Sequence, residues 1–77
     1  MKKTIQKLIE DIPNPKDKEL AKNLLSKNEF SNLRDLVYSA RIRFIKKKKE
    51  KTEEDEFTIS SLTKLMLLLD FSIEEDE

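Results

Sequence analysis

The sequence predicts an all-α fold: a small bundle of three to four short helices whose neighbours run antiparallel. Apolar residues recur every three or four positions along most of the chain, which is the helical period. The chain contains no Gly, which tight β-hairpins need. The connections between the helical patterns are short, and short connections place successive helices side by side. At 77 residues the chain is one domain, which we place at residues 1–73, with residues 74–77 as an acidic tail.

The first helix is expected over about residues 2–12, because four isoleucine and leucine residues share one face there, at Ile5, Leu8, Ile9 and Ile12. Pro13 ends it, since a proline disfavours helical geometry at the residue before it. The second helix is expected over about 15–27. Asn14 caps its start and Pro15 occupies its first position, while Asn28 is a left-handed terminator in a chain without Gly.

The third helix is expected over about 31–50, with Ser31 as its N-cap. One apolar stripe contains Leu33, Leu36, Val37, Ala40 and Phe44, and a second contains Tyr38, Ile42 and Ile45. Two stripes on one helix predict packing on two sides.

The fourth helix is expected over about 58–72, after a charged connector from Glu50 to Glu56. Phe57 and Leu62 have the spacing of a hydrophobic staple around its start. Apolar residues cover most of its circumference, so we expect it to be largely buried. The expected core of the bundle is Ile5, Leu8, Ile9, Leu20, Leu24, Leu33, Leu36, Val37, Ala40, Phe44, Leu62, Leu65, Met66 and Leu69.

The composition argues against several kinds of site. The chain has neither Cys nor His, so it can form no disulfide and we expect no metal site. A Gly-rich phosphate loop is impossible without Gly. Tyr38 and Ser39 have no activating partner at a suitable spacing, so we predict a protein that is not an enzyme, with no cofactor and no small-molecule substrate.

The formal net charge of zero conceals two oppositely charged halves. Residues 1–49 carry 14 Lys and Arg against 6 Asp and Glu, whereas residues 50–77 carry 2 Lys against 10 Asp and Glu. The basic half ends in a run that can contact phosphates or an anionic partner through Arg41, Arg43, Lys46, Lys47, Lys48 and Lys49. The alternative is a solvated helix end, where cations are favoured by the helix dipole.

The apolar surface of the third and fourth helices exceeds what a monomer of this size needs. Its candidate interface residues are Tyr38, Ile42, Ile45, Leu67, Leu68 and Phe71. The alternative is a fourth helix that is wrapped completely inside the core.

The leading functional hypothesis is a non-enzymatic interaction protein that binds a larger protein or self-associates through these apolar faces. Two alternatives stay open: nucleic-acid binding through the basic end of the third helix, and a minor structural role in an assembly such as a virion. A lysine-rich helical chain with an acidic tail is typical in style of small accessory proteins of phages and mobile elements. The longest apolar run, Leu65 to Leu69, is too short to span a bilayer. We therefore expect no membrane association, no targeting segment and a cytoplasmic location, in a host cell or in a virion.

Overall fold

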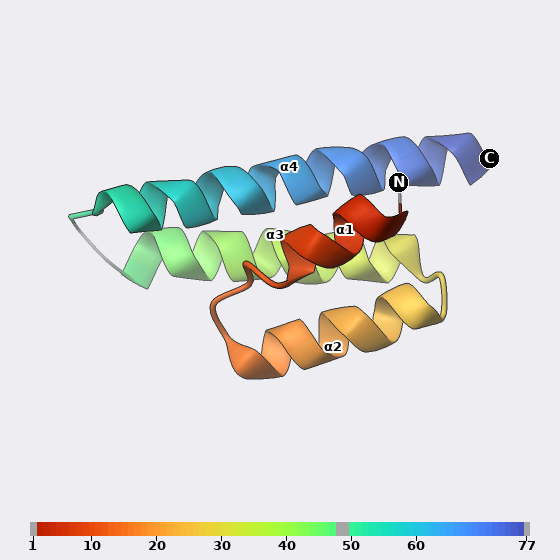
Figure 1. Cartoon of the computed structure of the whole chain (residues 1–77), viewed down its shortest axis with the longest axis horizontal. Helices are drawn as coiled ribbons and strands as arrows, with labels where there is room; N and C mark the ends of the chain where they lie inside the picture. Colours follow the sequence, from red (N-terminus) through yellow and green to blue (C-terminus); the bar gives the residue numbers. More distant parts are fainter. Residues whose placement is uncertain (1, 48–49, 77) are drawn as a thin grey trace.

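A computed structural model, which describes residues 2–47 and 50–76, confirms the all-α bundle (Figure 1). Its helices are α1 (Lys2–Ile9), α2 (Pro15–Ser26), α3 (Phe30–Lys47) and α4 (Glu53–Asp76). Among the described residues there is no strand. The molecule measures 39 × 21 × 19 Å. At 1.5 Å per residue, α4 alone is about 36 Å long and extends over almost the whole bundle.

Each helix packs against the next one along the chain, and α4 returns to pack against α1. Among the described residues, the diagonal pairs α1/α3 and α2/α4 make no close backbone contact. Neighbouring helices run antiparallel, so the N-terminus and the C-terminus lie at the same end of the molecule (Figure 1). The acidic start of α4 therefore lies beside the basic end of α3. The fold thus brings the two oppositely charged halves of the sequence together at this end.

Both predicted Asn signals at the ends of α2 are confirmed. The Asn14 side chain accepts hydrogen bonds from the backbone N–H groups of Lys16 and Asp17, at 2.8 and 3.3 Å. Asn28 has a φ of 59°, and Glu29 N–H donates to the Leu24 carbonyl while Asn28 N–H donates to that of Leu25. This is a Schellman motif, in which Asn takes the left-handed position usually held by Gly.

Several of the predicted boundaries differ by one to five residues: α2 ends at Ser26 and not 27, α3 ends at Lys47 and not 50, and α4 ends at Asp76 and not 72. The α-helical part of α1 ends at Ile9, and residues 10–12 continue as a tighter turn in which each N–H bonds three residues back. Ile12 precedes Pro13, which disfavours α-helical geometry there and explains the early end. Helix α3 begins at Phe30, one residue before the expected cap at Ser31.

The expected start of the fourth helix near Thr58 is wrong, because α4 begins at Glu53 and continues to Asp76. Thr52 Oγ1 accepts from Asp55 N–H at 3.2 Å, and Thr52 N–H donates to Asp55 Oδ2 at 3.0 Å. This reciprocal pair is a capping box. Of the expected connector from Glu50 to Glu56, residues 53–56 instead form the first turn of the helix, where carboxylates are favoured by the helix dipole.

The core contains apolar residues from all four helices and the turn after α1. Its fully buried members are Ile5, Ile9, Ile12, Ala21, Leu25, Leu33, Val37, Leu62, Leu65 and Leu69. The assignment of Leu20 to the core is wrong, since 48% of its surface is exposed. Helix α2 turns Ala21 and Leu25 inward instead.

Candidate protein-interaction face on α3 and α4

One complete side of α4 faces solvent, and much of it is apolar. Residues at the spacing of one helical stripe are all exposed, namely Phe57, Ser60, Lys64, Leu67 and Phe71. Phe57, Leu67 and Phe71 are 65%, 63% and 53% exposed. These are large side chains, and complete burial of each one is worth about 1.5–3 kcal/mol. Nothing in the described chain provides that burial.

A second solvent-facing stripe runs along α3. It contains Ser31, Asp35, Tyr38, Ile42 and Ile45, at helical spacing. Tyr38 is 52% exposed, whereas Ile42 and Ile45 are half-buried. The core residues of α3 lie on a different side of the helix, at Leu33, Val37 and Ala40.

Two polar contacts between α3 and α4 show how these stripes are placed. Arg34 Nη1 donates to Asp70 Oδ1 at 3.1 Å, and Arg41 Nε donates to Thr63 Oγ1 at 3.0 Å. Tyr38 lies one turn from each of these arginines on α3, and Leu67 lies one turn from both Thr63 and Asp70 on α4. Both residues face away from the core. The two stripes therefore flank the α3–α4 contact line from outside and form one surface, here called the outer face.

The outer face consists of the two stripes just described. It brings together Tyr38, Ile42, Ile45, Leu67 and Phe71 of the predicted interface set. It does not include Leu68, which is partly buried and packs against the core. Leu68 lies on the side of α4 that turns towards α1, whereas Leu67 lies on the open side.

The predicted basic residues divide into two groups. Arg41 and Arg43 contact other helices: Arg41 bonds to Thr63 as described, and the Arg43 guanidinium pairs with Asp17 at 3.0 Å. Lys46 and Lys47 are exposed, and neither forms an ion pair with any residue in the described ranges. Lys48 and Lys49 lie outside the described residues.

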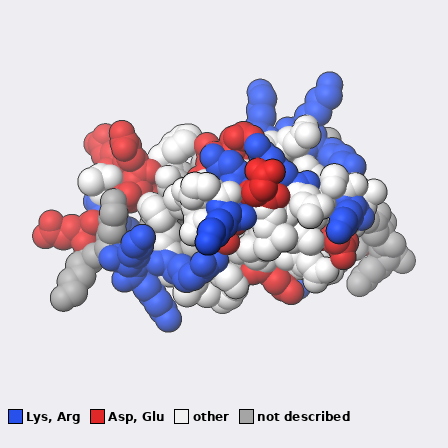
Figure 2. Space-filling model, turned by 90° about the horizontal axis from the view of Figure 1, so that it is seen from below, with Lys and Arg blue, Asp and Glu red and all other residues white. Residues whose placement is uncertain are grey.

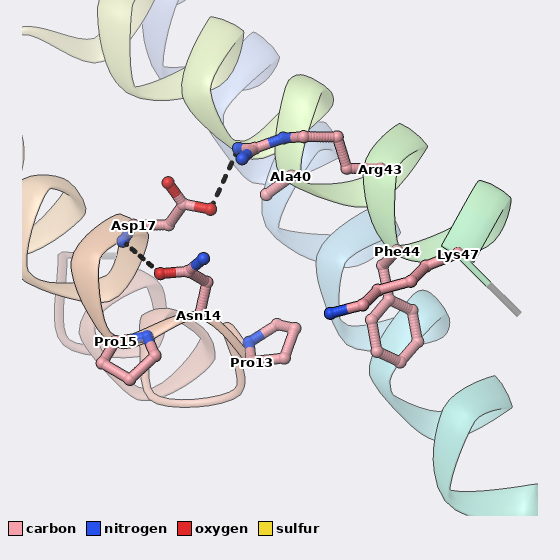
Figure 3. A pocket seen from close by; sticks show the side chains of 8 residues that line it. All are labelled: Pro13, Asn14, Pro15, Asp17, Ala40, Arg43, Phe44 and Lys47. Atoms are coloured by element: carbon pink, nitrogen blue, oxygen red, sulfur yellow. Dashed lines mark hydrogen bonds and ion pairs between the residues drawn. The ribbon is translucent and has the colours of Figure 1, made fainter.

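A shallow pocket of about 440 Å³ lies between the start of α2 and the last turns of α3 (Figure 3). Pro13, Pro15, Ala40 and Phe44 supply apolar walls, and Lys47 extends alongside the Phe44 ring towards Pro13. The ion pair between Arg43 and Asp17 borders the pocket. The first N–H groups of α2 are already bonded to Asn14, so they are not available to an anion at this place.

The side on which α2 lies has a different character, because charged side chains are spread over it (Figure 2). Lys22 Nζ lies 2.9 Å from Glu10 Oε1, and Lys18 Nζ lies 4.0 Å from Glu10 Oε2. The hydrogen bond from Lys22, and then its charge, lower the pKa of the Glu10 carboxyl. The same hydrogen bond and charge raise the pKa of Lys22. These contacts join the turn after α1 to the middle of α2.

Sequence reasoning missed two buried polar residues, Asp55 and Ser61, which are 6% and 5% exposed. Asp55 belongs to the capping box, and its signal was the spacing Thr52-Glu-Glu-Asp55. In the described chain, Asp and Glu side chains form no group of three placed to hold a metal ion.

None of the helices in the described ranges combines the length and apolarity needed to cross a membrane. No protein-family model, curated protein or solved structure matches this chain.

Proposed function

We propose that this chain is a non-enzymatic interaction protein that binds another protein through the outer face of α3 and α4. The observation that carries the proposal is the row of exposed apolar side chains on two adjacent helices, with Tyr38, Leu67 and Phe71 each more than half exposed. Single exposed apolar residues are ordinary, but a contiguous group that spans two helices is typical of a binding surface.

The composition of the face supports this proposal. Tyr and Phe are enriched at the centres of protein interfaces, where a rigid ring supplies contact area at little entropic cost. Charged residues surround them, with Asp35 and Lys46 along α3 and Glu56 and Lys64 along α4, all of them exposed. An apolar centre with a polar rim is the usual anatomy of an interface. A face made of two adjacent antiparallel helices suits packing against a helix of a partner protein.

Binding of nucleic acid through the basic end of α3 stays a prediction with less support. Of the four described cations in that set, Arg41 and Arg43 bond to other helices, which leaves Lys46 and Lys47 uncommitted. A steep fall in affinity with salt would identify such binding. We place the protein in the cytoplasm or in an assembly such as a virion, where an accessory protein of a phage or mobile element acts.

Site-specific photo-crosslinking tests the proposal. A photoreactive phenylalanine analogue replaces Leu67 in one variant and Leu20 in the other, and both variants are made in the cell that naturally produces the protein. Both positions are exposed leucines, but Leu20 lies on α2. We expect a discrete protein adduct from position 67 and none from position 20. Equal adducts at both positions, or none at position 67, would refute the proposal.

A further inference from the structure

We propose that a second copy of this chain occupies the outer face, in a dimer whose two-fold axis lies parallel to the helices. In this arrangement α3 of each protomer lies against α4 of its partner, and the four helices form a bundle of their own. The inference rests on the proposed function, because it names the partner for the same face.

The register between α3 and α4 gives the dimer a defined geometry. Arg34 lies level with Asp70 and Arg41 lies level with Thr63, and the same number of residues separates the two contacts on each helix. The helices therefore keep one antiparallel register. In this register Tyr38 lies within one residue of the level of Leu67, and Lys46 lies level with Thr58, two residues after Glu56.

A rotation about an axis parallel to the helices leaves the height of every residue along that axis unchanged. Each residue of α3 therefore faces the partner's α4 at the same height at which it lies beside α4 of its own chain. Tyr38 of each protomer then meets Leu67 of the other. The contact occurs twice by symmetry, and it would cover the most exposed apolar residues near the middle of the face. The half-buried Ile42 and Ile45 extend the same apolar strip along α3.

The charges of the face favour this arrangement over the other two-fold one. With the axis parallel to the helices, Lys46 at the basic end of α3 faces the partner's Glu56 in the acidic start of α4. With the axis perpendicular to the helices, α4 would lie antiparallel on its own copy. Lys64 would then approach its own symmetry mate, and the acidic first turns of α4 would meet the partner's Glu74. Like charges at such positions oppose association.

Small size adds a reason for self-association. A chain of this length has a small core, and burial against a second chain is a common supplement where disulfides and metals are absent. Isologous two-fold dimers are the commonest form of such association.

Sedimentation equilibrium over a wide range of protein concentrations tests the dimer. We expect a reversible monomer–dimer equilibrium, which Leu67→Glu weakens on the order of 30-fold or more by placing a charge at the centre of the contact. The matched control Leu20→Glu changes another exposed leucine, on α2, and should leave the equilibrium unchanged. Circular dichroism verifies that both variants remain helical. A wild-type chain that stays monomeric at the highest concentration, or equal weakening by both variants, overturns the proposal.

Charge reversal tests the orientation. Lys46→Glu and Glu56→Lys should each weaken the dimer by about fivefold, and the double variant should recover the wild-type affinity. If both single variants leave the dimer unchanged, the arrangement with the parallel axis is wrong. A monomeric chain that still gives a crosslink from position 67 to a different protein would refute the second copy as partner while supporting the proposed function.

Discussion

Helices α2 and α4 lie diagonally across the bundle and differ in the kind of side chain that they expose to solvent. The buried side of α2 is narrow, with Ala21 and Leu25 inside, and its exposed side carries charged residues. Ion pairs hold it on both flanks, to Glu10 after α1 and to Arg43 on α3. Helix α4 buries Leu62, Leu65 and Leu69 and still exposes three large apolar side chains on its outer side.

The difference shows where this chain has apolar surface beyond its own needs. A surface helix in a monomer usually has an apolar stripe that faces the core and a polar opposite side. Helix α2 follows that rule apart from Leu20, a single exposed leucine on a side that is otherwise polar and charged. Helix α4 does not follow it, so its outer side is the part of the molecule that an additional partner would stabilise most.

The largest expected effect is a difference in the free energy of unfolding between substitutions on the buried side and on the exposed side of α4. Leu69→Ala should lower the free energy of unfolding by about 3 kcal/mol, because Leu69 is completely buried and its truncation leaves a cavity. Leu67→Ala, two residues earlier, should change it by less than about 0.5 kcal/mol in dilute solution, where the chain is monomeric. Urea unfolding followed by circular dichroism measures both. Similar losses at the two positions would mean that the outer side of α4 is not free.

The next effect tests the packing of α2 around Ala21. Ala21→Leu should destabilise the fold by about 2 kcal/mol, since Ala21 is fully buried where α2 meets the core and a larger side chain cannot fit without a backbone shift. Leu20→Ala is the control on the exposed side and should be nearly neutral. The same urea titration applies. A neutral Ala21→Leu would show that α2 packs loosely, contrary to the complete burial of this side chain.

A smaller effect concerns the two helix starts. Thr52→Ala and Asn14→Ala should each cost about 1 kcal/mol, because each removes the side-chain oxygen that accepts backbone N–H groups at the start of α4 or α2. Thr52→Ser retains the oxygen and should recover most of the stability. Ser60→Ala, at an exposed position within α4, is the control. Thermal unfolding would contradict the capping roles if the Ala and Ser variants at position 52 behaved alike.

The smallest effect is the pH dependence that the pair between Glu10 and Lys22 adds to the α2 side. The folded state lowers the pKa of Glu10, so the pair stabilises the fold above the ordinary carboxyl pKa of 4.5 and loses that contribution as the pH falls through the lowered value. The raised pKa of Lys22 gives the opposite sign at alkaline pH: its contribution is lost as the pH rises through the folded-state value. Both groups are exposed, so the change in stability should be slight.

NMR titration of the Glu10 carboxyl carbon measures this contact directly. In Lys22→Gln the pKa of Glu10 should rise towards its ordinary value, while Lys27→Gln, at the C-terminal end of α2 and without this contact, should leave it unchanged. A Glu10 pKa that is equal in the wild type and in Lys22→Gln would show that the ion pair does not persist in solution.

Local signals were sufficient for much of the fold. Asn14 with Pro15 predicts the start of α2, and Asn28 predicts its end, because each acts through backbone groups only a few residues away. The start of α4 was also readable from Thr52 and Asp55, but the charged residues between them resembled a connector. Acidic residues suit both a solvated loop and a helix N-terminus, so their composition alone did not distinguish the two.

Which side of each helix is buried depends on the helices that pack against it, so the sequence of one helix did not determine it. Leu20 and Ala21 are adjacent in α2, and periodicity allowed either to lie at the centre of the buried side. The structure buries Ala21 completely and leaves Leu20 48% exposed. The sequence also did not show which of Leu67 and Leu68 is exposed, because α4 has apolar residues around most of its circumference.

The order of apolar, capping and breaking residues was enough to fix an all-α chain with its helices joined by short turns, because those interactions reach only one or two helical turns. Which apolar residues are hidden depends on contacts between residues far apart in the sequence, such as Arg34 with Asp70 and Arg41 with Thr63. The packing of α3 against α4 sets the rotation of the two helices about their axes. It leaves Leu68 partly buried against the core and Tyr38 and Leu67 exposed on the outer face.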